Sequence, residues 1–117
     1  MMLNRKIDER RSSERVAWQG QVQILPLIPF HPVLGLQQVR AQDLSESGLQ
    51  VQSERALPLK STVLVEMQAF NHPTGIQVIG SVIWISPAAA EHEWCLGIEF
   101  CDVGESARHG IRTLLKD

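Results

Sequence analysis

The apolar residues of this sequence recur at every second position in short segments, and this pattern constrains the fold more than any other feature. From about Val16 to Leu25, for example, Val22 and Ile24 alternate with glutamines. An extended strand turns successive side chains to opposite faces, so this period predicts strands with one face in a core and the other in water. The pattern predicts six strands, at about residues 16–25, 37–42, 49–53, 61–69, 76–86 and 93–101.

After the sixth segment, the apolar period becomes helical. Asp102 and Glu105 have the spacing of a capping box, which predicts the start of a helix. The apolar stripe of this helix consists of Val103, Ala107, Ile111, Leu114 and Leu115. Short strands separated by turn-forming residues and followed by one helix predict an all-β fold, a small six-stranded antiparallel β-barrel with a C-terminal α-helix.

Charge is distributed unevenly along the 117 residues. The net charge of −2 gives no global field that would attract nucleic acid or a membrane. Residues 1–15 nevertheless carry five basic and three acidic side chains, whereas the remainder carries six basic and ten acidic ones. Because residues 1–14 also lack periodic apolar positions, we predict a flexible N-terminal arm at 1–15 and a barrel at 16–117. A basic arm on an acidic body favours a local anion site over a nucleic-acid face.

The sequence contains no apolar run of signal-peptide length and none long enough to span a bilayer. We therefore expect a cytoplasmic protein without membrane insertion. The two cysteines, Cys95 and Cys101, do not form a disulfide framework, and we expect both to be reduced.

One connection between predicted strands is unusually apolar. The segment from Pro26 to Gly35 contains three prolines, which exclude a central strand and the interior of a helix. Two interpretations remain open for its large side chains. Phe30 and Leu34 either fold back over one end of the barrel or present an apolar patch to a protein partner.

Two short polar stretches contain the residues that are best suited to binding a ligand. Arg10, Arg11 and Arg15 lie just ahead of the first strand, and the last two have the spacing R-x-x-x-R. Asp43–Gly48 reads D-x-S-x-x-G and joins the second strand to the third. A guanidinium is planar and permanently charged, so it pairs in bidentate fashion with phosphate or with the O6/N7 edge of guanine.

These two motifs, in this order, resemble the signature of the PilZ domain family. Gly80–Trp84 resembles its later G-x-V-x-W pattern, and Leu96–Phe100 resembles its strand with glycine and phenylalanine three apart, so the resemblance extends from Arg10 to Phe100. It implies a small β-barrel that binds the bacterial second messenger cyclic di-GMP without catalysis and relays the signal to an unidentified protein partner. It implies no other cofactor. The ligand-binding residues that it implies are Arg10, Arg11, Arg15, Asp43, Ser45 and Gly48.

The resemblance also implies a role for each residue of the second motif. Asp43 accepts hydrogen bonds from the N1–H and N2–H₂ donors of a guanine, and Ser45 adds a hydroxyl. Gly48 sets the turn through a backbone angle that other residues adopt with strain. The arginine at position 10, directly before R-x-x-x-R, is similar to the residue found there in family members that bind a stacked pair of nucleotides, so the resemblance implies two nucleotides per chain. From the residues alone, Asp43 and Ser45 could instead satisfy only their own backbone in an Asx-turn.

Two other binding functions stay open. One is a PilZ-like interaction module that does not use the nucleotide, similar to members that act in pilus assembly and motility, although those members lack the two motifs. The other is a small nucleic-acid-binding barrel of the OB type. That class predicts exposed aromatic residues and a broadly basic face, whereas this chain has only six aromatic residues, most of them at core-facing positions.

Enzyme and metal-binding classes are disfavoured by missing motifs. The sequence has no P-loop, no G-x-S-x-G and no H-E-x-x-H. The pair His92-x-x-Cys95 has no matching second pair, so a zinc site is not predicted. We interpret Trp84 as a residue of the core or of the space between barrel and helix, and not as a ligand contact.

Overall fold

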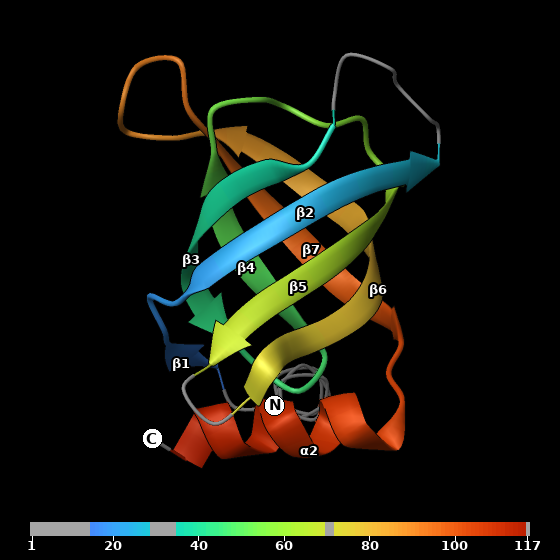
Figure 1. The fold of residues 1–117 in the computed structure, drawn as a ribbon. Helices are drawn as coiled ribbons and strands as arrows, with labels where there is room; N and C mark the ends of the chain where they lie inside the picture. The colour runs from blue at the N-terminus through green and yellow to red at the C-terminus, as the bar shows by residue number, and fades with distance from the viewer. Residues whose placement is uncertain (1–14, 29–34, 70–71, 117) are drawn as a thin grey trace, which may run out of the picture.

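The protein is a closed antiparallel β-barrel with one end crossed by a helix (Figure 1). This computed structural model describes residues 15–28, 35–69 and 72–116. Its elements are β1 (Val16–Ala17), β2 (Gln21–Ile28), β3 (Gln37–Leu44), β4 (Gly48–Ser53), β5 (Thr62–Ala69), β6 (His72–Pro87), β7 (Trp94–Asp102) and α2 (Glu105–Lys116). The predicted all-β fold class is thus confirmed.

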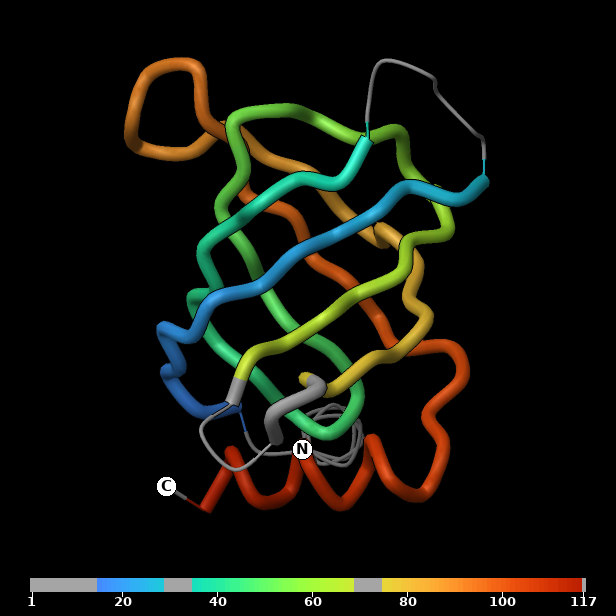
Figure 2. Tube along the Cα trace, in the orientation of Figure 1, coloured from blue at the N-terminus to red at the C-terminus, as the bar shows by residue number. Residues whose placement is uncertain are grey.

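Six of these strands form the barrel. Along the sheet the strands follow the order β1-β3-β2-β5-β6-β7-β4, and an additional pairing of β3 with β4 closes it. The short β1 is an extra strand that pairs with the last two residues of β3. Figure 2 shows the barrel strands crossing at a steep tilt, with loops gathered at the end opposite α2.

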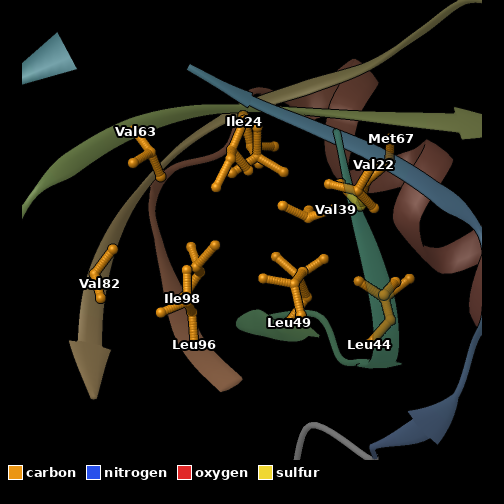
Figure 3. Close-up of a cluster of buried hydrophobic side chains, with 14 of the residues drawn as sticks. Val22, Ile24, Val39, Leu44, Leu49, Val63, Met67, Val82, Leu96 and Ile98 are labelled. Carbon is orange, nitrogen blue, oxygen red and sulfur yellow. The ribbon is translucent and has the colours of Figure 1, made fainter. Parts of the chain in front are cut away.

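The barrel interior contains the apolar residues that the period of two assigned to it. Val39 and Ala41 are buried while Arg40 between them is exposed, as predicted. Figure 3 shows the aliphatic side chains of different strands converging on one core. The fully buried members include Ile24, Leu44, Leu49, Val63, Val65, Met67, Leu96 and Ile98.

The predicted first strand is divided in two. Residues 18–20 separate β1 from β2, although the amide of Trp18 still donates to the carbonyl of Gln42, 3.2 Å away. The indole of Trp18 lies over Gly20, where a Cβ atom would overlap the ring. The strand is thus interrupted where this large ring packs over Gly20, a break that local periodicity did not indicate.

The predicted loop at 26–35 begins later than expected, because β2 continues to Ile28. Pro26 is buried within β2 and is paired with Val63 of β5. Among the described residues, pairing between β2 and β3 ends at Ile24, so Pro26 lies where β2 pairs with β5 alone and a missing amide hydrogen costs little. Phe30 and Leu34, for which we predicted contact with the barrel end or a partner, lie outside the described residues.

The stripe of apolar residues on α2 packs against the barrel, as predicted, with Ile111 only 1% exposed. The predicted capping residue was wrong. Asp102 belongs to β7, where it pairs with Ile79, and the first helical carbonyl is that of Gly104, which accepts from the amide of Arg108. Strand pairing therefore extends as far as the residue that resembled a cap.

Helix α2 packs against β6 at one end of the barrel. In Figure 1, α2 crosses the barrel end where β5 finishes and β6 begins. Near the other end of β6, Ile83 is 48% exposed beside a bulge between Val82 and Trp84. The indole of Trp84, a residue of β6, packs against β7 and fills the space above Gly97. No helix of the described residues is long and apolar enough to cross a membrane.

Candidate functional site

The D-x-S-x-x-G segment forms a tight connection at the barrel end that α2 crosses (Figure 1). We predicted the whole of 43–48 as the connection, but Asp43 belongs to β3 and Gly48 to β4, which leaves only residues 45–47 outside the strands. The amide of Ser45 donates to the carbonyl of Gly48 at 2.9 Å. Strand pairing thus continues almost to the tip of the turn.

Ser45 is 1% exposed, and its hydroxyl lies within the turn. The hydroxyl donates to the carbonyl oxygen of Gly48 at 3.3 Å and accepts from the amide of Ser47 at 3.2 Å. These bonds match the alternative in which this serine satisfies its own backbone. In this structure Ser45 shapes the turn, and its direct contact with a ligand stays a prediction.

Gly48 is required for a different reason from the one predicted. Among the described residues Gly75 is the glycine with a positive φ, at 78°, so the predicted strained backbone angle at Gly48 was wrong. A Cβ atom at Gly48 would instead overlap the carbonyl oxygen of Ile98 on β7. The amide of Phe100 also donates to the carbonyl of Ser47 at 2.8 Å. The turn is therefore held tightly against β7.

The two motifs meet at Arg15 and Asp43. Nη1 of Arg15 donates to Oδ1 of Asp43 at 2.6 Å, although the residues are 28 positions apart. The pairing of β1 with β3 produces this contact, because it places Ala17 opposite Asp43. The Arg15 side chain is 49% exposed, so its guanidinium is accessible to a ligand. Arg10 and Arg11 lie outside the described residues.

A second arginine reaches the same turn from α2. Nε of Arg112 donates to Oε1 of Glu46 at 2.8 Å, across 66 positions of sequence. Sequence reasoning missed this contact, because only the folded barrel places α2 beneath the turn. The sequence did contain one sign that this helix has a basic face. Arg108, Arg112 and Lys116 are spaced four residues apart, which places three cations along one side of the helix.

The electrostatic balance of the site follows from these two ion pairs. Asp43 and Glu46 each hold one guanidinium, and all four side chains are partly or largely exposed. Exposed ion pairs of this kind contribute little to stability, so their partners can be exchanged. The arrangement can present carboxylate acceptors and guanidinium donors to a ligand that has both N–H groups and phosphates. No cluster of potential metal ligands occurs within the part of the chain that the structure describes.

A hollow lies elsewhere, on the outer face of the barrel. This open groove of about 520 Å³ is lined mainly by polar side chains of β2, β3 and β4 and by the loop that follows β6. At its rim, Nη2 of Arg40 donates to Oε1 of Glu93 at 2.6 Å. The predicted site residues that the structure describes, namely Arg15, Asp43, Ser45 and Gly48, do not line the groove. We place the candidate site at the turn, where the two motifs meet, and not in the groove.

Comparison with known proteins identifies a family that matches this chain. The family model of the PilZ domain matches residues 9–117. No curated protein matches the chain significantly. Several solved structures are similar, however, at low sequence identity.

The inhibitor of motility MotI/DgrA from Bacillus subtilis has a TM-score of 0.71 and 12% identity, with 92% of this chain and 50% of that chain covered. The PilZ domain of YcgR from Escherichia coli, solved with c-di-GMP, has a TM-score of 0.67 and 17% identity, with 92% and 89% covered. PlzA from Borreliella burgdorferi, solved in complex with c-di-GMP, has a TM-score of 0.57 and 10% identity, with 97% and 56% covered. The chain thus spans only half the length of the Bacillus protein. At these identities, the likeness shows a shared fold.

Proposed function

This chain belongs to the PilZ domain family, and we propose that it binds cyclic di-GMP and relays the signal to a protein partner as a non-enzymatic effector. The observation that carries the proposal is the contact of Arg15 with Asp43, because it brings the two family motifs to one point of the fold. The similar structures of YcgR and PlzA, which were solved with c-di-GMP, support the same ligand.

In the proposed complex, the arginines bind the charged and planar parts of the nucleotide. Arg15, together with Arg10 and Arg11, pairs with phosphate or with the O6/N7 edge of a guanine and stacks on a base. Asp43 accepts from the N1–H and N2–H₂ donors of one guanine. Binding therefore replaces the 2.6 Å contact between Arg15 and Asp43, at least in part, with contacts to the ligand.

The turn gives this exchange a fixed framework. Ser45 and Gly48 hold the backbone against β4 and β7 through buried hydrogen bonds and close packing. In the proposal these two residues shape the surface on which a guanine rests, and the exposed side chains of Arg15 and Asp43 rearrange. The ligand needs no deformation of the barrel, and packed barrels resist deformation.

We propose that the signal is read from the segment ahead of β1. A cyclic dinucleotide neutralises several arginines at once and provides bases on which their guanidiniums stack. It should therefore draw Arg10 and Arg11 against the turn that contains Asp43. This rearrangement changes one face of the molecule, which a protein partner can recognise.

A second candidate is an interaction module that does not use the nucleotide, and exposed apolar residues at the opposite barrel end favour it. Ile28 is 66% exposed at the end of β2. Leu59 and Ile83 are also exposed, and the amide of Lys60 bonds the carbonyl of Val82 between them. Uncovered apolar side chains at neighbouring positions are typical of protein contact surfaces. This surface is compatible with either function, since a nucleotide effector also needs a partner.

A calorimetric titration with cyclic di-GMP tests the proposal, with GTP and cyclic GMP as controls. We expect saturable binding of cyclic di-GMP and no comparable binding of the two controls. The position of Arg10 predicts a stoichiometry of two nucleotides per chain. Saturation at one would remove that detail alone, whereas absence of cyclic di-GMP binding would refute the function and favour the interaction module.

A further inference from the structure

The exposed face of α2 carries a stripe of cations that the two family motifs do not include. Arg108, Arg112 and Lys116 follow one another at intervals of four residues, and all three are exposed. Side chains at this spacing lie on one face of a helix. Of these three, Arg112 has a carboxylate partner among the described residues, and that partner is Glu46 at the tip of the D-x-S-x-x-G turn.

Two guanidiniums therefore contact this one turn, one near each end. Arg15 bonds Asp43 at 2.6 Å, and Arg112 bonds Glu46 at 2.8 Å. Asp43 and Glu46 are three positions apart, so at most about 10 Å of extended backbone separates their Cα atoms. A ligand that rests on the turn thus meets Arg15 on one side and Arg112 on the other.

The charges at the turn suit a ligand with two anionic groups. Before binding, the two carboxylates of the turn balance the two guanidiniums. A cyclic dinucleotide carries two phosphodiesters, one for each nucleotide, and each prefers a guanidinium partner. Of the motif arginines, Arg15 is the one within the described residues, and it lies directly before β1. Of the cations on the described residues, Arg112 is the one bonded to the other end of the turn.

We propose that Arg112 is an additional phosphate-binding residue for the nucleotide and that Glu46 competes with the phosphate for it. This inference rests on the proposed function. In the free protein, Glu46 holds the guanidinium at the turn. On binding, Arg112 rotates from the carboxylate of Glu46 to a phosphate oxygen, and Glu46 then lies near the ligand as an unfavourable negative charge.

The structure permits this exchange without movement of the backbone. Both side chains of the pair are well exposed, at 57% for Arg112 and 41% for Glu46, so the ion pair is weak. Ser45 and Gly48 fix the turn, while Ile111, the neighbour of Arg112, anchors α2 in the core. The arginine side chain is long enough to change partners while its helix stays in place.

Calorimetric titration of four variants with cyclic di-GMP tests the inference. We expect Arg112→Ala to weaken binding about tenfold, because a charge-assisted contact is lost. Arg112→Lys should recover part of the loss, since it keeps the charge without the planar fork. Glu46→Gln should strengthen binding about threefold, because the competing partner and its negative charge are removed. A double variant of both residues should bind no more weakly than Arg112→Ala and more weakly than Glu46→Gln, because the negative charge is removed but the phosphate contact is still lost.

The pair Arg40 and Glu93 provides a matched control. It is also an exposed arginine–glutamate pair, with a separation of 2.6 Å, but it lies at the rim of the outer groove, away from the turn. Arg40→Ala and Glu93→Gln should leave the affinity unchanged. If Arg112→Ala and Glu46→Gln behave like these controls while the wild-type protein binds, the inference is wrong and the proposed function stands. If the wild-type protein does not bind, both are refuted.

Discussion

The two ends of the barrel differ in what covers them. At one end, α2 inserts Ile111 into the core, and the turn at 45–47 is fixed to β4 and β7 by hydrogen bonds. At the other end, the loops leave Ile28, Leu59 and Ile83 exposed to solvent. The first end combines a rigid backbone with exposed charged pairs, which suits binding of a small anion. The second presents apolar surface, which suits contact with a protein.

The largest effect that this contrast predicts concerns ligand binding. Arg15→Ala should weaken cyclic di-GMP binding by about 2–5 kcal/mol, because it leaves the charge of the ligand without its partner. Arg11→Ala should have an effect of similar size, as its place in the R-x-x-x-R motif indicates. Calorimetry measures both. Arg40→Ala, at the outer groove, is the control that should bind normally, and wild-type affinity in the Arg15 variant would contradict the assignment.

The next effect concerns stability and compares two isoleucines. Ile111→Ala should lower the free energy of unfolding by about 2–5 kcal/mol, because it leaves a cavity where α2 enters the core. Ile83→Ala, at the half-exposed position near the opposite end, should change it by no more than about 0.5 kcal/mol. Urea denaturation followed by circular dichroism measures both values. Equal losses would show that α2 does not close the barrel as described.

A smaller loss of stability is expected at Gly48. Gly48→Ala should cost about 1–3 kcal/mol, because the added methyl group overlaps the carbonyl oxygen of Ile98 and forces the turn away from β7. Gly35→Ala is the control, since nothing lies within 4 Å of the Cβ position there. The same denaturation experiment applies. A stable Gly48 variant that binds the nucleotide normally would argue against a rigid turn.

The sequence was sufficient to predict the features that depend on local periodicity. Alternation placed Val63, Val65 and Met67 in the core, and the structure confirms each of them. The helical stripe around Ile111 is confirmed for the same reason. The burial of these residues can be predicted from the periodicity of a single strand or helix, because it does not depend on which element packs against that strand or helix.

The features that local periodicity could not predict arise from contacts between distant segments. Gly48 is needed because β4 approaches β7 closely, a fact that no residue near Gly48 reveals. The contact of Arg112 with Glu46 depends on where α2 crosses the barrel. Asp102 has the spacing of a helix cap, but it pairs with Ile79 of β6, and this pairing cannot be predicted from the local sequence. The motifs indicated the candidate site, but the second arginine at the turn emerged only from the fold.

Hydrogen exchange with and without cyclic di-GMP tests the central claim most directly, because it locates the ligand on one end of the barrel. We predict that saturating nucleotide protects the amides from about Glu9 to Ala17 and those at the turn of residues 45–47. The amides of the loops at 54–60 and 88–93, at the opposite end, should exchange at unchanged rates. Protection of those loops, or no added protection ahead of β1 at saturation, would contradict the account.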